Sequence, residues 1–472
     1  MSGWSKEQQL FAWSMVLLVV LFVVPSNKAL LLVSFIFTVG LSFILKKFTL
    51  AILYAYILML PFQNGKGMDF LVVPAELVYG NTPFIMTVNI TVSGLLSIVL
   101  LYMHIRDRIF SKQISSSTQI NTSDILLGIF IVATIVASIM SNIPLLSFLL
   151  ALQICGYIFV YYYIQHHRLH LWVIKILPTL LSSLSIFEGV WSILQYVNKG
   201  SFGYLSPSPA DNLTHVAMED VSFVRMQGTF GHPNNLGFFM ACITPFLFYY
   251  SVSKHTSVFT KIISSVGFIS GVTALLLSGS RASWIFFALA MVLILRIPII
   301  RASQAVIPFV KRLYLSYVIF CAILIPFIVI PRLSQLAVTF NVGGGAEFRW
   351  DLINKSFQIT AHNPLGVGLG IFPQIVFYQI KGFTSAPTQP HNLIAQIMVA
   401  SGYIGAISFF GFLYLKIKMY FLPITPRVKY LQLMHYIGMI SLGVFLALSM
   451  FYPILTEQQL FAWLWILLSI VA

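Results

Sequence analysis

The chain has 472 residues, of which 58% are hydrophobic and only 8% are charged. Soluble globular proteins carry roughly 25% charged residues, so this composition excludes a soluble enzyme and indicates a membrane protein. The net charge of +15 does not point to nucleic acid, because the Lys and Arg residues lie in short clusters between apolar runs, which is the pattern that orients membrane proteins.

Apolar runs long enough to cross a bilayer recur along the whole chain. The sequence therefore predicts one membrane domain over 1–472, an all-α polytopic protein with about 12 to 14 transmembrane helices of roughly 20 residues each. In chain order, the predicted spans are 8–24, 29–45, 48–62, 86–104, 125–140, 144–164, 176–197, 234–253, 262–278, 283–299, 313–330, 391–415, 431–450 and 457–472.

The distribution of positive charge predicts the orientation of these spans. With the N-terminus inside the cell, every inside loop holds at least one Lys or Arg, and most of these residues fall inside. Two outside loops are long, about 198–233 and about 331–390, and both are rich in aromatic residues, Gly, Pro and ionisable residues. Loops of this kind carry function more often than short connections do, although they could also be linkers.

A short segment occurs twice. Residues Glu7–Trp13 recur identically as Glu457–Trp463, and the predicted topology puts the two copies on opposite faces of the membrane. Inverted repeats occur in transporters, but no similarity extends beyond this segment, and the sequence offers no physical account of it.

The first long loop ends in a polar segment, Arg225–Asn235, that leads into the next span. Its glycines and proline indicate a turn, and Arg225 and Asn234 are candidate substrate contacts at the membrane face. Earlier in the chain, Glu188 lies within a span. An intramembrane carboxylate is expected either to pair with an arginine or to stay protonated.

Arg281 lies in the tight turn Ser278–Ser283 between two spans. An arginine so close to hydrocarbon is costly unless it is paired or faces a wet cavity. It could extend its side chain to the interface, or it could bind an anion at the mouth of a cavity.

Arg349 lies in a predicted amphipathic helix over 346–361. At 100° per residue its side chain projects inside the apolar arc, so we expect it to point toward protein or membrane. A guanidinium in that position needs an anionic partner, and a bidentate phosphate suits its geometry. The alternative is a structural salt bridge to Glu347 or Asp211.

His391 follows Gln389 and Pro390 and opens a span. An unperturbed imidazole can accept a proton from a hydroxyl at neutral pH, although a lone histidine at this position could simply start a helix. No Cys or His spacing typical of zinc and no paired aspartates typical of Mg²⁺ are present, so the sequence predicts no metal site. The run Gly366–Gly370 lacks the strand–turn–helix context of a dinucleotide site and indicates a turn.

Four segments together resemble the bacterial O-antigen ligase and O-antigen polymerase superfamily. They come in the order of that family, with a large extracytoplasmic loop before the histidine, and cover roughly 220–410. The pattern His391-Asn392 followed by Gly402-x-x-Gly405 resembles the ligase branch in particular. The segments are QGTFGHPNNLGFF (227–239), LSGSRASW (277–284), FRWDLINKSFQITAHNPLGVGLGIF (348–372) and QPHNLIAQIMVASGYIGAI (389–407).

The resemblance implies a membrane glycosyltransferase of the GT-C type in the bacterial inner membrane. It implies a glycan on undecaprenyl diphosphate as the donor, a hydroxyl of a lipid A core sugar as the acceptor on the periplasmic face, and no metal or other cofactor. The two essential arginines of the family map onto Arg281 and Arg349, and its histidine maps onto His391. Asn392 and the aromatic residues Tyr204, Phe348 and Trp350 are candidate contacts to the sugars.

Two alternatives remain open at this point. A polymerase would join one lipid-linked repeat unit to another instead of delivering the glycan to a lipid A core. A transporter of lipid-linked sugar would need ionisable residues and broken helices near the middle of the membrane, whereas only Glu188 lies deep in a predicted span.

Overall fold

The structure is a computed structural model of the chain. The parts of the chain that it describes are residues 4–23, 27–62, 68–73, 86–110, 121–199, 215–216, 223–296, 346–379, 389–420, 429–455 and 457–471.

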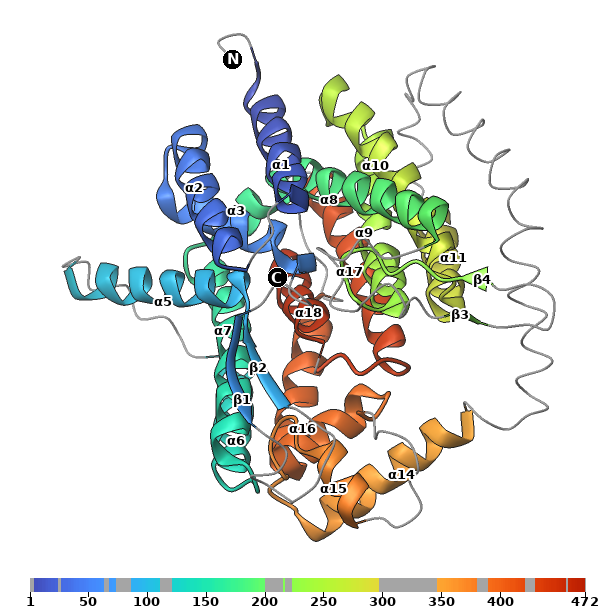
Figure 1. Cartoon of the computed structure of the whole chain (residues 1–472). Coiled ribbons are helices and arrows are strands. Elements are labelled where there is room, and N and C mark those ends of the chain that lie inside the picture. The colour runs from blue at the N-terminus through green and yellow to red at the C-terminus, as the bar shows by residue number, and fades with distance from the viewer. Residues whose placement is uncertain are drawn as a thin grey trace.

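Helices make up most of the described residues (Figure 1). A helix satisfies its backbone hydrogen bonds within itself, which a bilayer requires of any segment that crosses it. Among the described residues, six helices are long and apolar enough to cross a membrane, and five shorter apolar helices accompany them. The predicted all-α polytopic membrane fold is confirmed.

The first half of the chain contributes α1 (Lys6–Val23), α2 (Asn27–Leu45), α3 (Phe48–Leu58), the short 3-10 helix η1 (Leu60–Phe62), α5 (Val92–Phe110), α6 (Thr122–Ile139), α7 (Pro144–His166) and α8 (His170–Asn198). The second half contributes α9 (Pro233–Val252), α10 (Val258–Leu277), α11 (Arg281–Arg296), α14 (Ala346–His362), α15 (Phe372–Gln379), α16 (Leu393–Tyr420), α17 (Lys429–Ser449) and α18 (Gln458–Val471).

Two small antiparallel sheets accompany the helices: β1 (Met68–Val73) with β2 (Met86–Ile90), and β3 (His215–Val216) with β4 (Phe223–Val224). The prediction of a span over 86–104 is therefore wrong at its start, because residues 86–90 form β2 and the helix begins at Val92. An apolar run does not by itself distinguish a strand from a helix. The predicted span 313–330 lies outside the described residues.

Helix α9 is the most enclosed of the membrane helices. It packs against α8, α10, α11 and α17. In its most apolar 18-residue stretch, 94% of the residues are buried inside the protein, compared with 33% for α6. The C-terminal helix α18 is also enclosed, between α7 and α17, and lies near the centre of the view in Figure 1. Both helices are therefore surrounded largely by protein.

Small residues let α8 and α10 approach closely. A Cβ on Gly189 would lie only 2.6 Å from the carbonyl oxygen of Ser270, and the Ser185 hydroxyl donates to the carbonyl oxygen of Gly267 at 2.7 Å. Small residues at helix contacts are the usual means of tight packing in membranes, where lipid supplies no hydrophobic drive between helices.

The amphipathic helix predicted over 346–361 is confirmed as α14, which lies beside α15 and α16 (Figure 1). The chain after α14 packs against a kink in α16 at Gly402, whose φ is +68°. The Tyr403 N–H donates to the carbonyl oxygen of Pro364 at 3.0 Å, and a Cβ on Gly402 would collide with that oxygen. The kink thus explains one glycine of the His391–Gly405 pattern. In the predicted loop 331–390, the described residues 346–379 hold α14 and α15.

The repeated segment begins a helix at both of its positions. Glu7 accepts hydrogen bonds from the hydroxyls of Ser257 and Thr260, at 2.7 and 2.8 Å, at the start of α10. Glu457 accepts one from the Asn235 side chain, at 2.7 Å, at the start of α9. Since α9 and α10 are consecutive and packed together, the two copies lie at opposite ends of this helix pair.

Candidate active site

Arg225 is a buried arginine that ties the start of α9 to the end of α10. Its Nε donates to the carbonyl oxygen of Ser278 at 2.9 Å, and its Nη2 donates to Oδ1 of Asn234 at 2.5 Å. The neighbouring Met226 N–H donates to the carbonyl oxygen of Leu277 at 3.0 Å. The two candidate substrate contacts, Arg225 and Asn234, are therefore brought together, and they bind each other.

The turn between α10 and α11 is held by serine hydroxyls. The Ser280 hydroxyl lies 2.8 Å from that of Ser283 and 2.7 Å from the hydroxyl of Tyr452, just after α17. Gly237 of α9 makes this packing possible, because a Cβ there would lie 2.7 Å from Oγ of Ser278. These contacts fix the backbone that carries Arg281.

Arg281 is the first residue of α11, and its side chain is partly buried. Its Nη1 is enclosed and, within the described part of the chain, has no hydrogen-bond partner. Arg349 lies close enough for the like charges of the two guanidinium groups to repel each other. An enclosed cation beside another cation is a site that favours an anion.

Arg349 lies in the first turn of α14 and is exposed. At 100° per residue it shares a face with the buried residues Leu352 and Ser356, but it precedes them and is not enclosed. Of the two predicted surroundings of this side chain, protein or membrane, enclosure by protein is not found among the described residues. Among the described side chains no carboxylate forms an ion pair with Arg349, and its two predicted partners, Asp211 and the side chain of Glu347, lie outside them.

His391 immediately precedes α16 and is partly buried, with an enclosed Nδ1 that has no hydrogen-bond partner among the described residues. The pKa of His391 is lowered to about 4, chiefly by burial and in addition by the positive charge of Arg349, while a hydrogen bond with the backbone of Phe451 partly offsets both. A low pKa keeps the imidazole neutral at pH 7, so that it retains a lone pair to accept a proton.

Asn392 has a structural task beside His391. Its Oδ1 accepts from the N–H of Ala395 at 3.1 Å in the first turn of α16, and its Nδ2 donates to the carbonyl oxygen of Met450 at 3.4 Å. Asparagine is a good helix cap for this reason. The side chain therefore anchors the histidine segment to the end of α17.

His232 is a residue of this region that sequence reasoning did not single out. It is the N-cap of α9, and its Nδ1 accepts from the N–H of Asn234 at 3.1 Å. The pKa of His232 is lowered to about 4, chiefly by burial and in addition by the charges of Arg225, His391 and Arg349. The sequence signal that could have identified His232 is its position in a polar segment, directly before a proline that starts a helix.

These five residues form what we call the arginine–histidine site: Arg225, His232, Arg281, Arg349 and His391. They come from four segments of the chain. His232, Arg281, Arg349 and His391 lie at or just before the N-termini of α9, α11, α14 and α16, and Arg225 lies in the segment that leads into α9. Helix N-termini carry partial positive charge and orphan N–H groups, which also favour anions. The arrangement can bind a multivalent anion and present a neutral base beside it.

Glu188, the intramembrane carboxylate, binds the loop that follows Arg225 in the chain. It accepts from the Thr229 N–H at 3.0 Å and also from the Thr229 hydroxyl. About two turns further along the same face of α8, Gln195 donates to the carbonyl oxygen of Gly228 and accepts from its N–H, at 3.1 and 3.0 Å. Of the two predicted alternatives for Glu188, an arginine partner or a protonated carboxyl group, the arginine is not found among the described residues, and Thr229 binds the carboxyl group through its N–H and hydroxyl.

The remaining predicted contacts are less central. Trp350 is on α14 next to Arg349 and is 64% exposed, while Phe348 packs partly against the cluster under α14. Tyr204 lies outside the described residues. Tyr452, which binds Ser280, was not predicted, because it follows a span with no polar motif around it.

Metal ligands are a separate matter from this site. Within the described ranges, one group of histidines, aspartates, glutamates or cysteines has its ligand atoms close enough to share an ion: His104, His166 and His167. These residues lie on α5 and at the end of α7, which carry no residue of the arginine–histidine site. The sequence predicted no metal site, because His104 is a whole helix away in the chain from the other two.

Part of the chain matches a known protein family. Residues 266–410 match the sequence model of the family described as O-antigen ligase. The matched range contains Arg281, Arg349 and His391, and the match confirms the resemblance to the O-antigen ligase and polymerase superfamily over this part of the chain. No curated protein matches the chain.

Proposed function

We propose that this membrane protein, whose residues 266–410 carry the O-antigen ligase match, transfers a glycan from undecaprenyl diphosphate to an acceptor hydroxyl. The acceptor would be a sugar of a lipid A core, and the reaction would take place on the periplasmic face of the bacterial inner membrane, with the N-terminus in the cytoplasm. The observation that carries the proposal is the convergence of the arginines and histidines of the arginine–histidine site. Two of these arginines, Arg281 and Arg349, have no carboxylate partner among the described side chains.

The leaving group explains the arginines. As the bond between the anomeric carbon and the diphosphate oxygen breaks, the bonding electrons stay with the diphosphate, which gains negative charge. Fixed cations that are already in place stabilise such a charge without reorganisation. Arg281 and Arg349 would bind the diphosphate, and Arg225, already bound to Ser278 and Asn234, would hold the turn that presents Arg281.

The acceptor explains the histidine. The neutral imidazole of His391 would take the proton of the acceptor hydroxyl as its oxygen bonds to the anomeric carbon. Attack from the face opposite the leaving diphosphate inverts the configuration at that carbon. The proposed transfer needs no metal ion, because the arginines supply the positive charge. Trp350, exposed beside Arg349, and Phe348 would contact the sugars.

An apolar groove supports a lipid-linked donor. The groove lies between α11 and α17, has a volume of about 550 Å³ and is lined almost wholly by apolar side chains. Phe286 begins the groove on α11, about 7.5 Å along the helix axis from Arg281 at 1.5 Å per residue. A polyprenyl tail could lie partly in this groove while its diphosphate reaches Arg281. The lining residues include Phe286, Leu289, Leu293, Met439, Ile440 and Val444.

The test is glycan transfer by purified protein from a polyprenyl-diphosphate-linked glycan to a lipid A core acceptor. We expect Arg349→Ala and His391→Ala each to lower the rate by roughly 100-fold or more. The matched controls are Arg106→Ala, an exposed arginine paired with Asp107, and His362→Ala, an exposed histidine on the same helix as Arg349. Full activity in either site variant would overturn the assigned roles.

The product identifies the branch of the superfamily. A ligase yields glycan on the core sugar, whereas a polymerase yields a longer glycan still bound to the polyprenyl carrier. In cells, loss of a ligase leaves polymerised glycan on the carrier, while loss of a polymerase leaves single repeat units on the surface. Growth of carrier-bound glycan without core transfer would replace the ligase proposal by the polymerase.

A further inference from the structure

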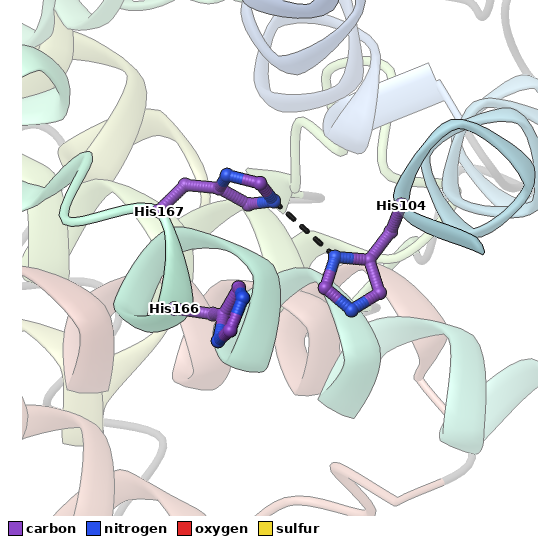
Figure 2. Close-up of side chains that lie close together, drawn as sticks. All are labelled: His104, His166 and His167. Carbon is purple, nitrogen blue, oxygen red and sulfur yellow. Dashed lines mark hydrogen bonds between the residues drawn. The ribbon is translucent and has the colours of Figure 1, made fainter. Parts of the chain in front are cut away.

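We propose that His104, His166 and His167 form a zinc-binding site where α5 meets the end of α7 (Figure 2). One ligand nitrogen from each histidine lies within 4.8 Å of the other two. His104 comes from α5, His166 is the last residue of α7 and His167 is its C-cap, so a bound ion would join two helices that are separated in the chain by α6.

The spacing of two of the nitrogens already suits a metal ion. Nδ1 of His104 lies 3.2 Å from Nε2 of His167, as the dashed line in Figure 2 shows. Two nitrogens that bind one tetrahedral Zn²⁺ at about 2.0–2.1 Å lie roughly 3.3 Å apart. Only the third nitrogen, from His166, has to move closer for all three to reach the ion.

Zinc binding would replace the hydrogen bond between His104 and His167 by a bond from each ring to the metal. Without metal, one of the two facing nitrogens carries the proton and the other accepts it. When zinc binds, that proton leaves the facing nitrogen and the same ring is protonated on its other nitrogen, which faces away from the ion. Both facing lone pairs then go to the metal, and the neutral charge of each ring is unchanged.

The backbone holds the two adjacent histidines in place. Arg168 adopts the left-handed conformation, with φ of +53°, and the N–H groups after the helix donate back into it. Leu169 donates to the carbonyl oxygen of Ile164 at 2.8 Å, and Arg168 donates to that of Gln165 at 3.1 Å. This is a Schellman motif, which satisfies the last carbonyls of a helix and fixes its end. His166 and His167 are therefore presented on a rigid terminus.

Aromatic side chains hold the imidazole rings. Tyr162 stacks on His166 with ring centroids 5.6 Å apart, and the Tyr163 ring lies 4.3 Å from that of His167. On the other side, the His104 ring lies 5.8 Å from Phe159. Rings that are held before a ligand arrives lose less freedom on binding, which favours affinity.

The surroundings favour a cation of the zinc type. The C-terminus of a helix carries partial negative charge, and Arg106, near His104 in the chain, is paired with Asp107 at 2.8 Å. Imidazole nitrogens suit zinc better than they suit magnesium or calcium, which prefer oxygen. His104 is buried and His167 is exposed, so an ion could enter from solvent and be held by a buried ligand. Three histidines leave the fourth position of Zn²⁺ to water.

The test uses the full-length chain, purified without a histidine tag and stripped of metal with EDTA. Calorimetric titration with Zn²⁺ should show one bound ion per chain, and Co²⁺ should give the visible absorption bands of a tetrahedral site. We expect His167→Ala to weaken zinc binding by more than the roughly 10- to 100-fold that loss of an outer-sphere partner costs. Because His167 is exposed, this variant should fold normally.

A second readout separates a true site from general metal binding. Zinc should raise the melting temperature of the wild-type protein, since a ligand that binds only the folded state stabilises it, and it should not do so in His167→Ala. His255→Ala, at an exposed histidine outside the cluster, should behave like the wild type. Absence of binding at micromolar zinc, or binding and stabilisation that survive in His167→Ala, would overturn the proposal.

Discussion

The arginine–histidine site and the histidine cluster between α5 and α7 show how the same ring can be prepared for opposite partners. In the first, His232 and His391 lie at helix N-termini among arginines, and the surroundings lower the pKa of both rings to about 4. In the second, His166 and His167 lie at the C-terminal end of α7, and their ligand atoms and that of His104 on α5 lie within 4.8 Å of one another. We infer that the helix terminus and the neighbouring charges, rather than the residue type, determine whether a group of histidines attracts an anion or a cation.

The largest expected effect is at Arg281. Arg281→Ala should lower the rate of glycan transfer by roughly 100- to 1,000-fold, because a fixed positive charge at the leaving group is lost. Arg281→Lys should recover part of the rate, since it restores the charge but not the bidentate geometry. The measurement is the transfer rate of purified variants at saturating donor.

The histidine cluster supplies the contrast for this experiment. His167→Ala should change the rate by less than about twofold, because the two regions share no element and distant sites act independently. The same variant is the right background for an EDTA test of metal independence, since it removes the zinc site before the chelator is added. A loss of transfer in His167→Ala as large as that in Arg281→Ala would break the proposed division between the two regions.

The sequence predicted the fold well where one physical signal dominates. Long apolar runs without charges can only be satisfied as helices in a bilayer, and each predicted span in the described ranges overlaps a helix. The error at residues 86–90 arose where a short apolar run is compatible with either a strand or a helix. The amphipathic helix around Arg349 was predicted from the spacing of its apolar residues. The exposure of the Arg349 side chain depends on where the neighbouring helix α16 contacts this helix, and the spacing gives no information about that contact.

The site was predictable only in part for a related reason. Arg281, Arg349 and His391 stood out because each lies in a polar motif next to a span. The structural tasks of Asn392 and of Glu188, the coupling of Tyr452 to Ser280 and the meeting of His104 with His166 all depend on contacts between distant helices. Such contacts leave no spacing signal in a single sequence.

A smaller effect concerns acid stability. The folded-state pKa of both His232 and His391 is about 4, below the value of roughly 6.5 expected in the unfolded chain. The unfolded state therefore binds protons more readily, so this contribution to stability is complete above pH 6.5 and is lost as the pH falls from 6.5 to 4. We expect a loss on the order of 3 kcal/mol for each histidine.

The measurement is the thermal stability of the purified protein between pH 7 and pH 4. The double variant His232→Asn, His391→Gln should lose much of the pH dependence, since neither new side chain titrates and asparagine can still cap α9. His362→Gln, at an exposed position on α14, serves as the control and should keep the wild-type profile. An unchanged profile in the double variant would show that other groups cause the acid lability.

The smallest expected effect measures the electrostatic link inside the arginine–histidine site. Arg349→Ala should raise the pKa of His391, because a like charge that opposes protonation is removed. The rise should be roughly one unit or less, since burial, the larger cause of the low pKa, remains. The pKa of His232 should shift less than that of His391, because Arg349 is the weakest of the causes that act on His232.

The pH dependence of diethyl pyrocarbonate modification, followed by mass spectrometry of the peptides that contain each histidine, reports these pKa values, since only the neutral ring reacts. His167 provides the internal comparison and should react as in the wild type. A His391 pKa that stays at about 4 in Arg349→Ala would mean that the guanidinium does not act on this ring, and it would contradict the electrostatic link inside the arginine–histidine site.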